Sequence, residues 1–204
     1  QLALEQKEKQ LNELSKSLEQ KSADLKEQQK QLTELQAILD KKDQDIQNLK
    51  NKIKQALQGF EGSGLSVTEK NGKIYVSMEE QLLFATGSYA IGEHGKEALK
   101  KLASVLETDK TISVMVEGHT DNVKYNPSAS SQIKDNWDLS VMRATSVVKT
   151  LLGYGNIEPE RLIASGRSEY VPLDIADTKE ARAKNRRTEI ILTPKLDQLF
   201  EILE

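Results

Sequence analysis

The sequence predicts an α+β protein in which a long N-terminal coiled-coil helix precedes a two-layer sandwich of helices on a mixed sheet. Two observations carry this prediction. Residues 1–58 contain no glycine, proline or aromatic residue and place an apolar residue at every seventh position. After a glycine-rich segment, strand-like stretches are interleaved with helix-like ones, an order that is typical of two-layer sandwiches.

The seven-residue repeat begins at Leu4 and ends at Ile53. Its members are Leu4, Leu11, Leu18, Leu25, Leu32, Leu39, Ile46 and Ile53. A fixed repeat of seven predicts a left-handed coiled coil. If these residues take position a of the heptad, half of the residues at position d, the other core position, are polar. We therefore expect weak association between the helices. The segment is thus expected to be a spacer that forms a homodimer; the alternative is a single solvated helix, which gains little stability without a packing partner.

The expected domain boundaries follow from the change in composition. The coiled-coil rod is predicted over residues 1–58 and a flexible linker over residues 59–64, where Gly59, Gly62 and Gly64 end the helix. The folded domain is predicted over residues 65–194 and a last helix over residues 195–204. The chain opens inside the repeat and without Met, so we expect a fragment whose targeting signal or lipid anchor lies upstream.

Within the domain, Asn71-Gly72 predicts a tight hairpin turn between two short strands. A polar loop over residues 121–135 is long for a simple connection, which is typical of functional loops. The next helix is expected to bury Val141, Ala144, Val148 and Leu151. Strands are predicted over residues 65–68, 73–78, 111–117, 161–165 and 188–192, and helices over residues 93–107, 137–152 and 178–186.

Composition excludes several functional classes. The net charge is −3 with a pI near 5.6, which argues against a nucleic-acid partner. There is no cysteine, so disulfides and zinc–thiolate sites are excluded. No run approaches the roughly 18 apolar residues that a bilayer span requires. We therefore expect no cofactor and no metal, and contact with a membrane only through an upstream anchor.

Four segments together resemble the OmpA-like peptidoglycan-binding domain of the OmpA, MotB and Pal proteins. The similarity covers roughly residues 64–194 and is strong because all four segments occur in the family's order. Their details look most like the MotB branch. The segments are Val116-Glu117-Gly118-His119-Thr120-Asp121-Asn122, Asn136-Trp137-Asp138-Leu139-Ser140-Val141-Met142-Arg143-Ala144, Arg161-Leu162-Ile163-Ala164-Ser165-Gly166 with Pro172, and Asn185-Arg186-Arg187-Thr188-Glu189-Ile190.

The resemblance implies a βαβαβαβ sandwich that binds peptidoglycan non-covalently and is not an enzyme. It implies a protein of the periplasm or outer membrane of a Gram-negative bacterium, which anchors an envelope protein to the cell wall. The alternative is the periplasmic part of a MotB-type flagellar stator protein. That function requires a membrane-spanning helix with an ion-carrying carboxylate, and this sequence contains none.

The expected ligand is diaminopimelate, whose free end carries an ammonium and a carboxylate on one carbon. Asp121 follows a strand and is expected to take the ammonium. Arg143 is expected on the polar flank of the next helix, where its planar fork can bond both oxygens of the carboxylate. By resemblance Thr120, Asn136, Leu139 and Arg186 line the same pocket. The alternative for Asp121 and Arg143 is a salt bridge that ties the strand to the helix.

Some residues depart from the family pattern or support other functions less well. Ala85, Ala176 and Ala181 stand where relatives often carry Asp, Asn and Gly, and they affect the expected strength of binding. A metal-dependent hydrolase would use His94, His119 and Asp121, but their spacing does not imply convergence. His119 is therefore expected to be structural, and Trp137 to be a packing residue.

Overall fold

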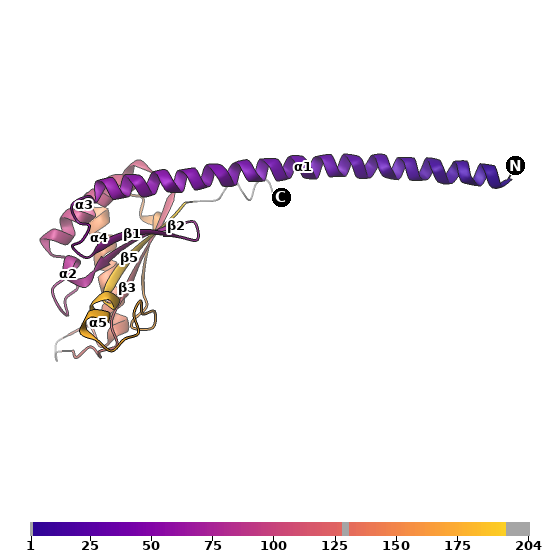
Figure 1. The fold of residues 1–204 in the computed structure, drawn as a ribbon. Coiled ribbons are helices and arrows are strands. Elements are labelled where there is room, and N and C mark those ends of the chain that lie inside the picture. The colour runs from indigo at the N-terminus through magenta and orange to yellow at the C-terminus, as the bar shows by residue number, and fades with distance from the viewer. Residues whose placement is uncertain (1, 128–130, 195–204) are drawn as a thin grey trace. The chain divides into compact units, whose positions relative to one another are not determined.

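The computed structural model describes residues 2–127 and 131–194, with a mixed sheet and helices as its main elements (Figure 1). The helices are α1 (Leu2–Ala56), α2 (Glu80–Leu83), α3 (Glu93–Thr108), α4 (Asn136–Tyr154), the short 3-10 helix η1 (Pro159–Arg161) and α5 (Lys179–Asn185). The strands are β1 (Leu65–Lys70), β2 (Lys73–Glu79), β3 (Ile112–His119), β4 (Leu162–Gly166) and β5 (Arg187–Pro194). The predicted α+β fold class is confirmed, and each predicted strand and helix within residues 65–194 is present.

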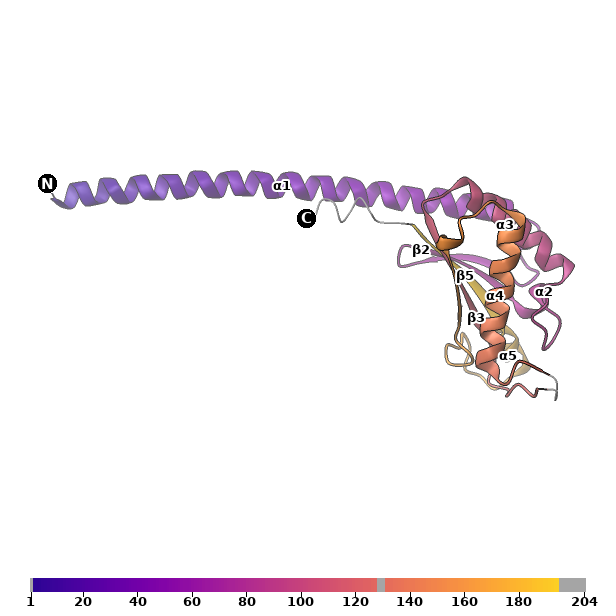
Figure 2. The same ribbon diagram turned by 180° about the vertical axis from the view of Figure 1, so that it is seen from behind.

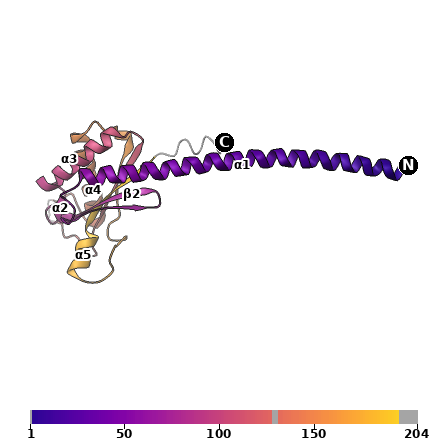
Figure 3. The same cartoon turned by 45° about the horizontal axis from the view of Figure 1, so that its top comes forward.

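The five strands form one mixed sheet in the order β1-β2-β5-β3-β4. The β3–β4 pair is parallel, and the other pairs are antiparallel. The hairpin turn falls at Asn71-Gly72, where both residues have positive φ (53° and 69°), as a tight two-residue turn requires. Figure 3 shows this turn and α5 at opposite ends of the sheet.

One face of the sheet carries the core. Val114 and Val116 of β3, and Ile190 and Leu192 of β5, are at most 1% exposed, and they alternate with side chains of the opposite face. Helices α3 and α4 lie over the core face (Figure 2). The buried face of α4 is rotated from the predicted one. Ala144, Val147 and Leu151 are buried in α4, and Val141 is 40% exposed.

The C-terminal end of α1 belongs to the folded domain. The chain divides into two compact units between Gln44 and Asp45, not at the glycine-rich segment where the domain boundary was expected. Ile46, Leu49, Ile53 and Leu57 are at most 4% exposed and join the same hydrophobic core as the sheet residues. Lys50 pairs with Glu69 of β1 at 3.0 Å. Ile46, Leu49 and Ile53 continue the repeat of the rod, but they pack on the domain.

The segment at residues 59–64 is a hydrogen-bonded reversal that leads from α1 into β1. The amide of Phe60 donates to the carbonyl of Leu57 at 3.1 Å, and the amide of Glu79 donates to the carbonyl of Gly64 at 2.7 Å. Gly64 needs its positive φ of 86° because it turns the chain beside Glu79.

The other compact unit contains the N-terminal part of α1. Among the described residues, the predicted repeat has no packing partner here, since Leu4, Leu11, Leu18, Leu25 and Leu32 are 65–70% exposed. None of the helices in residues 2–127 and 131–194 has an apolar stretch of the length that a bilayer span requires. The last helix predicted over residues 195–204 lies outside the described residues.

Candidate functional site

The predicted site residues gather at one end of the sheet, around the C-terminal end of β3. The sheet register sets His119 opposite Arg187, so the loop that leaves β3 begins beside the residue that precedes β5. Asp121 follows β3 by two residues, and Arg186 immediately precedes β5. Helix α4 brings Asn136 and Arg143 to the same place. This arrangement supports the sequence prediction that residues far apart in the chain form one site.

Two glycines let the first turns of α4 approach the sheet closely. A Cβ on Gly118 would lie 2.1 Å from the carbonyl oxygen of Ser140, and one on Gly166 would lie 2.4 Å from its hydroxyl. No larger residue fits at these separations. The Ser140 hydroxyl also accepts from the amide of Ser168 at 3.2 Å. Backbone contact therefore fixes where α4 presents its polar side chains.

Four charged side chains form an alternating series, which we call the ion-pair chain: Arg143, Glu80, Arg186 and Asp121. Arg143 and Arg186 each donate to a different oxygen of the Glu80 carboxylate. Arg186 also donates from Nη1 to Oδ2 of Asp121 at 2.6 Å. Asp121 and Arg143 are thus linked through Glu80 and Arg186, and among the described residues no direct salt bridge joins them.

Arg143, which was predicted on the polar flank of α4, is buried. It is 2% exposed. Its Nε donates to the carbonyl of Ser88 at 3.0 Å, and its guanidinium carbon lies 5.1 Å from the centre of the Phe84 ring. A buried guanidinium is tolerated here because Glu80 balances its charge and a backbone carbonyl accepts a hydrogen bond from it. Nε and Nη2 of Arg143 make these bonds, and within the described parts of the chain Nη1 has no hydrogen-bond partner.

Asp121 is held at the start of the long loop. Its Oδ1 accepts from the amide of Val123 at 3.1 Å. Asn136 donates from Nδ2 to the carbonyls of Val123 (3.0 Å) and Asp121 (3.4 Å) and to Glu169 Oε2 (3.1 Å). The Thr120 amide donates to the carbonyl of Ser168 at 2.9 Å. Asn136 and Thr120 therefore shape the loop that carries Asp121.

Arg186 and Arg187 point to different partners, as the strand alternation predicts. Burial alone would lower the pKa of Arg186, but its hydrogen bonds to Asp121 and Glu80 outweigh this and raise the pKa. Arg187 instead donates to Glu189 at 2.7 Å and to the carbonyl of Val171 at 3.2 Å. Leu139 is 5% exposed in the first turns of α4, where its amide donates to the carbonyl of Asp135.

Sequence reasoning missed Glu80, although it touches both arginines of the site. It lies on the four-residue helix α2, which is not among the helices that the sequence predicts. The one available signal was a carboxylate two residues before the apolar Leu82-Leu83-Phe84 run. Trp137, which was expected to be a packing residue, is 48% exposed and stacks on Tyr170 with ring centres 5.6 Å apart.

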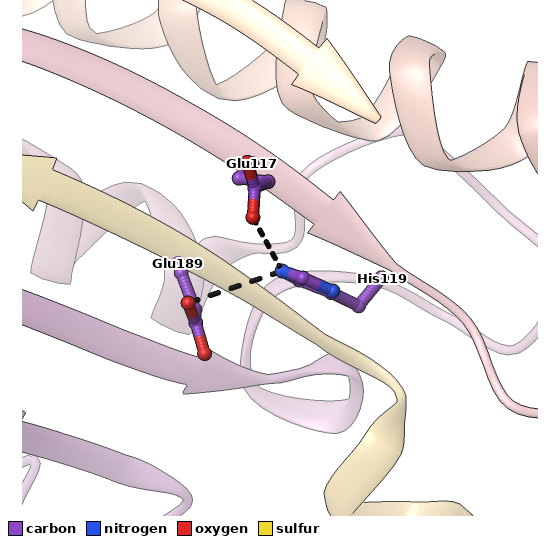
Figure 4. Close-up of side chains that lie close together, drawn as sticks. All are labelled: Glu117, His119 and Glu189. Atoms are coloured by element: carbon purple, nitrogen blue, oxygen red, sulfur yellow. Dashed lines mark ion pairs between the residues drawn. The ribbon is translucent and has the colours of Figure 1, made fainter. Parts of the chain in front are cut away.

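His119 is buried, as expected of a structural residue, but its surroundings are polar. It is 1% exposed and lies between the carboxylates of Glu117 and Glu189 (Figure 4). Burial lowers the pKa of His119 to about 3, helped by the positive charges of Arg187 and Arg167. The ring is therefore neutral at pH 7. Asp121 and His94, which the hydrolase alternative needed, are not part of this group.

In chemical terms the ion-pair chain can hold a small zwitterion. Two guanidinium groups and two carboxylates give it no net charge, so a ligand with one ammonium and one carboxylate leaves the balance unchanged. A carboxylate has about four acceptor positions, and Asp121 uses two for Val123 and Arg186. Asp121 can thus still accept from an ammonium, and Nη1 of Arg143 can donate to a carboxylate.

Several known proteins are similar to this chain in sequence and fold. Motility protein B of Bacillus subtilis is 25% identical over 150 residues, which cover 73% of this chain and 56% of that protein. The chain therefore spans little more than half the length of this curated relative. The periplasmic domain of Helicobacter pylori MotB matches with a TM-score of 0.61 and 26% identity, over 71% of this chain and 88% of that one.

A second solved structure, the cell wall anchor of the T6SS from Pseudomonas aeruginosa, matches with a TM-score of 0.62 and 28% identity. The match covers 70% of this chain and 97% of that one. The family model described as OmpA family matches residues 83–186. That range includes Asp121, Asn136, Arg143 and Arg186, and the chain belongs to the OmpA family.

Proposed function

We propose that the domain binds peptidoglycan non-covalently, through the diaminopimelate of the stem peptide, and so anchors an envelope protein to the cell wall. The observation that carries this proposal is the ion-pair chain, which has an acceptor at Asp121 and a donor at Arg143. The ligand ammonium binds Asp121, and the ligand carboxylate binds Nη1 of Arg143. Thr120, Asn136 and Leu139 hold the loop and helix around these two groups, and Arg186 keeps Asp121 in place.

The comparisons support this proposal. One similar structure is described as a cell wall anchor and another as a periplasmic domain, and peptidoglycan lies in the periplasm of Gram-negative bacteria. We therefore place this domain in the periplasm, and any contact with the inner or outer membrane comes from an anchor outside this sequence. The domain does no chemistry on the wall. Purified sacculi incubated with it are expected to yield the same muropeptides as sacculi incubated with heat-inactivated protein.

Co-sedimentation with purified sacculi tests the function. Asp121→Asn removes the charge that takes the ammonium, and Asn can still accept from Val123. A charge-assisted hydrogen bond contributes about 1.5–3 kcal/mol, so binding is expected to weaken roughly tenfold to a hundredfold. The matched control is Asp177→Asn, which removes an exposed carboxylate paired with Arg182 and is expected to bind like wild type. Normal binding by a folded Asp121→Asn variant contradicts the proposed site.

The rod is proposed to be a spacer that forms a homodimer through its N-terminal part. Its apolar repeat is solvent-exposed from Leu4 to Leu32, and a coiled coil buries such a stripe against a second copy. Residues 2–44 would extend about 65 Å at 1.5 Å per residue. The seam is weak because Lys7, Lys21, Gln28 and Lys42 occupy d positions.

The second candidate is the periplasmic part of a MotB-type stator protein. The similarity to motility protein B of B. subtilis and to H. pylori MotB favours it. In that case the same peptidoglycan site would hold the stator still while ions pass through another part of the assembly. The sequence upstream of Gln1 discriminates the two: a membrane span with an acidic residue supports a stator, and a lipid-modified cysteine supports a lipoprotein anchor.

A further inference from the structure

A cluster of three side chains, of which two are buried and one is partly buried, lies at the junction of β3 and β5, on the sheet face opposite the helices. Gly118 faces Ser140 of α4, and because side chains alternate along a strand, Glu117 and His119 point to the other face. Glu189 lies directly across from Glu117 in the sheet register. The three ligand atoms that these residues offer all lie within 4.8 Å of one another.

The imidazole of His119 lacks hydrogen-bond partners among the described residues. Both of its ring nitrogens are buried, and neither has a hydrogen-bond partner among the described residues. A buried polar atom without a partner costs about 1–3 kcal/mol. Figure 4 shows the ring edge directed between the two carboxylates. Nε2 lies 3.4 Å from Oε1 of Glu117 and 3.9 Å from Oε2 of Glu189.

We propose that Glu117, His119 and Glu189 bind a divalent cation of the zinc type. Zn²⁺ binds imidazole nitrogen and carboxylate oxygen at about 2.0–2.2 Å, and two ligands of a tetrahedral ion at that radius are about 3.4 Å apart. The separations of 3.4 and 3.9 Å match this spacing after a small movement of Glu189. Mixed nitrogen and oxygen ligands favour Zn²⁺ over Mg²⁺ and Ca²⁺, which prefer oxygen alone.

Two arginines bond the carboxylates of this cluster. Arg167 bonds Oε2 of Glu117 at 2.9 Å, and Arg187 bonds Oε1 of Glu189 at 2.7 Å. Each guanidinium therefore holds the outer oxygen of its carboxylate and leaves the inner oxygen facing His119. Hydrogen bonds of this kind orient the ligands of metal sites. The positive charges of the two arginines weaken the attraction for the cation, so the site is expected to be of modest affinity.

The cation would join the C-terminal end of β3 to the start of β5. Thr120 and Asp121 follow His119 directly, and Arg186 precedes Glu189 by three residues. Metal binding would thus stiffen the strand ends that carry two members of the ion-pair chain. This inference stands independently of peptidoglycan binding, because it rests on the opposite face of the sheet.

Calorimetric titration of the full chain with Zn²⁺ tests the proposal, with protein that carries no histidine tag and has been treated with chelator. We expect one Zn²⁺ per chain and a higher melting temperature. Glu117→Gln and Glu189→Gln are each expected to weaken binding at least tenfold. The matched control is His94→Ala, which removes the other, exposed histidine and should bind Zn²⁺ like wild type.

A second measurement uses wild-type protein alone, in case the glutamine variants do not fold. Nitrogen-15 spectra of the two imidazoles should show the Nε2 resonance of His119 shifting on addition of Zn²⁺ while His94 is unchanged. The proposal is overturned if Zn²⁺ leaves the His119 resonances in place, if both folded glutamine variants bind like wild type, or if Mg²⁺ and Ca²⁺ compete equally with Zn²⁺.

Discussion

The guanidinium of Arg143 is paired with the carboxylate of Glu80 across 63 residues of sequence, and both groups are buried. This pair joins α2 to α4 at the end of the sheet where Asp121 lies. Because Glu80 also accepts from Arg186, one carboxylate positions both arginines of the proposed site. Arg143 is therefore a structural residue as well as a proposed ligand-binding one. Its replacement is expected to change both stability and binding, whereas replacement of Asp121 is expected to change binding alone.

Replacing Arg143 with Ala is expected to lower stability as well as binding. Removing one partner of a buried ion pair costs about 3–5 kcal/mol, and the lower end applies here because Glu80 keeps Arg186. Urea denaturation at pH 7 measures this loss. Asp121→Asn should lose binding while its midpoint stays close to wild type, since Arg186 remains paired with Glu80. Equal stability of Arg143→Ala and wild type would show that the pair contributes nothing to folding.

Much of this fold follows from local sequence. Asn71-Gly72 specifies the hairpin because both turn residues need positive φ, and alternation identifies the strands. The positions of Asp121 and Arg186 also follow, because each lies within a few residues of one end of a predicted strand. These features depend on a few neighbouring residues, which is why a single sequence is sufficient to predict them.

Other features depend on contacts between distant segments. Glu80 could not be assigned to the site because its partners lie 63 and 106 residues away. Charge alone suggests a surface position for Arg143, whereas the compensating carboxylate permits burial. Leu4 and Ile53 occupy the same position of one heptad repeat, yet Leu4 is 70% exposed and Ile53 is buried. The seven-residue period is the same for an apolar residue that would pack against a second copy of the chain and for one that packs on its own domain.

Gly118→Ala is expected to destabilise the domain, because its Cβ would lie 2.1 Å from backbone oxygen of Ser140. Relief requires moving α4 away from β3, and such overpacking costs about 1–3 kcal/mol or more. The matched control is Gly153→Ala near the end of α4, where a Cβ meets nothing within 4 Å. Alanine in a helix is favoured over glycine by about 0.5–1 kcal/mol, so this variant should melt higher. Similar melting of the two variants would contradict the close approach of α4.

Stability below pH 5 is expected to depend on Glu158. Hydrogen bonds from Arg161 chiefly, and also from Lys110, lower the pKa of Glu158 from 4.5 to about 2. A carboxylate with a lowered pKa in the folded state stabilises the protein fully above its unfolded pKa. That contribution is lost as the pH falls from 4.5 to about 2. In thermal melts, Glu158→Gln should lie below wild type at pH 6, and the difference should shrink over this range; a constant difference contradicts the assignment.

The boundary between rod and domain predicts how two truncations behave. A fragment of residues 45–204 keeps Ile46, Leu49, Ile53 and Leu57, so its domain should melt like that of the full chain. A fragment of residues 60–204 loses all four. Burying one such side chain stabilises the fold by about 1.5–3 kcal/mol, and the free energy of unfolding of a whole domain is only about 5–15 kcal/mol. This fragment should therefore be largely unfolded or aggregated.

The same fragments separate folding from association. The full chain should show a concentration-dependent equilibrium of monomer and dimer in sedimentation equilibrium, because polar d positions weaken the seam. Residues 45–204 should remain monomeric, since they lack the exposed part of the repeat. Replacing Lys21 and Gln28 with Leu in the full chain should tighten the dimer, whereas Glu19→Gln, outside the a and d positions, should not. A full chain that stays monomeric at high concentration contradicts the coiled coil, and a well-folded fragment of residues 60–204 contradicts the packing of α1 on the domain.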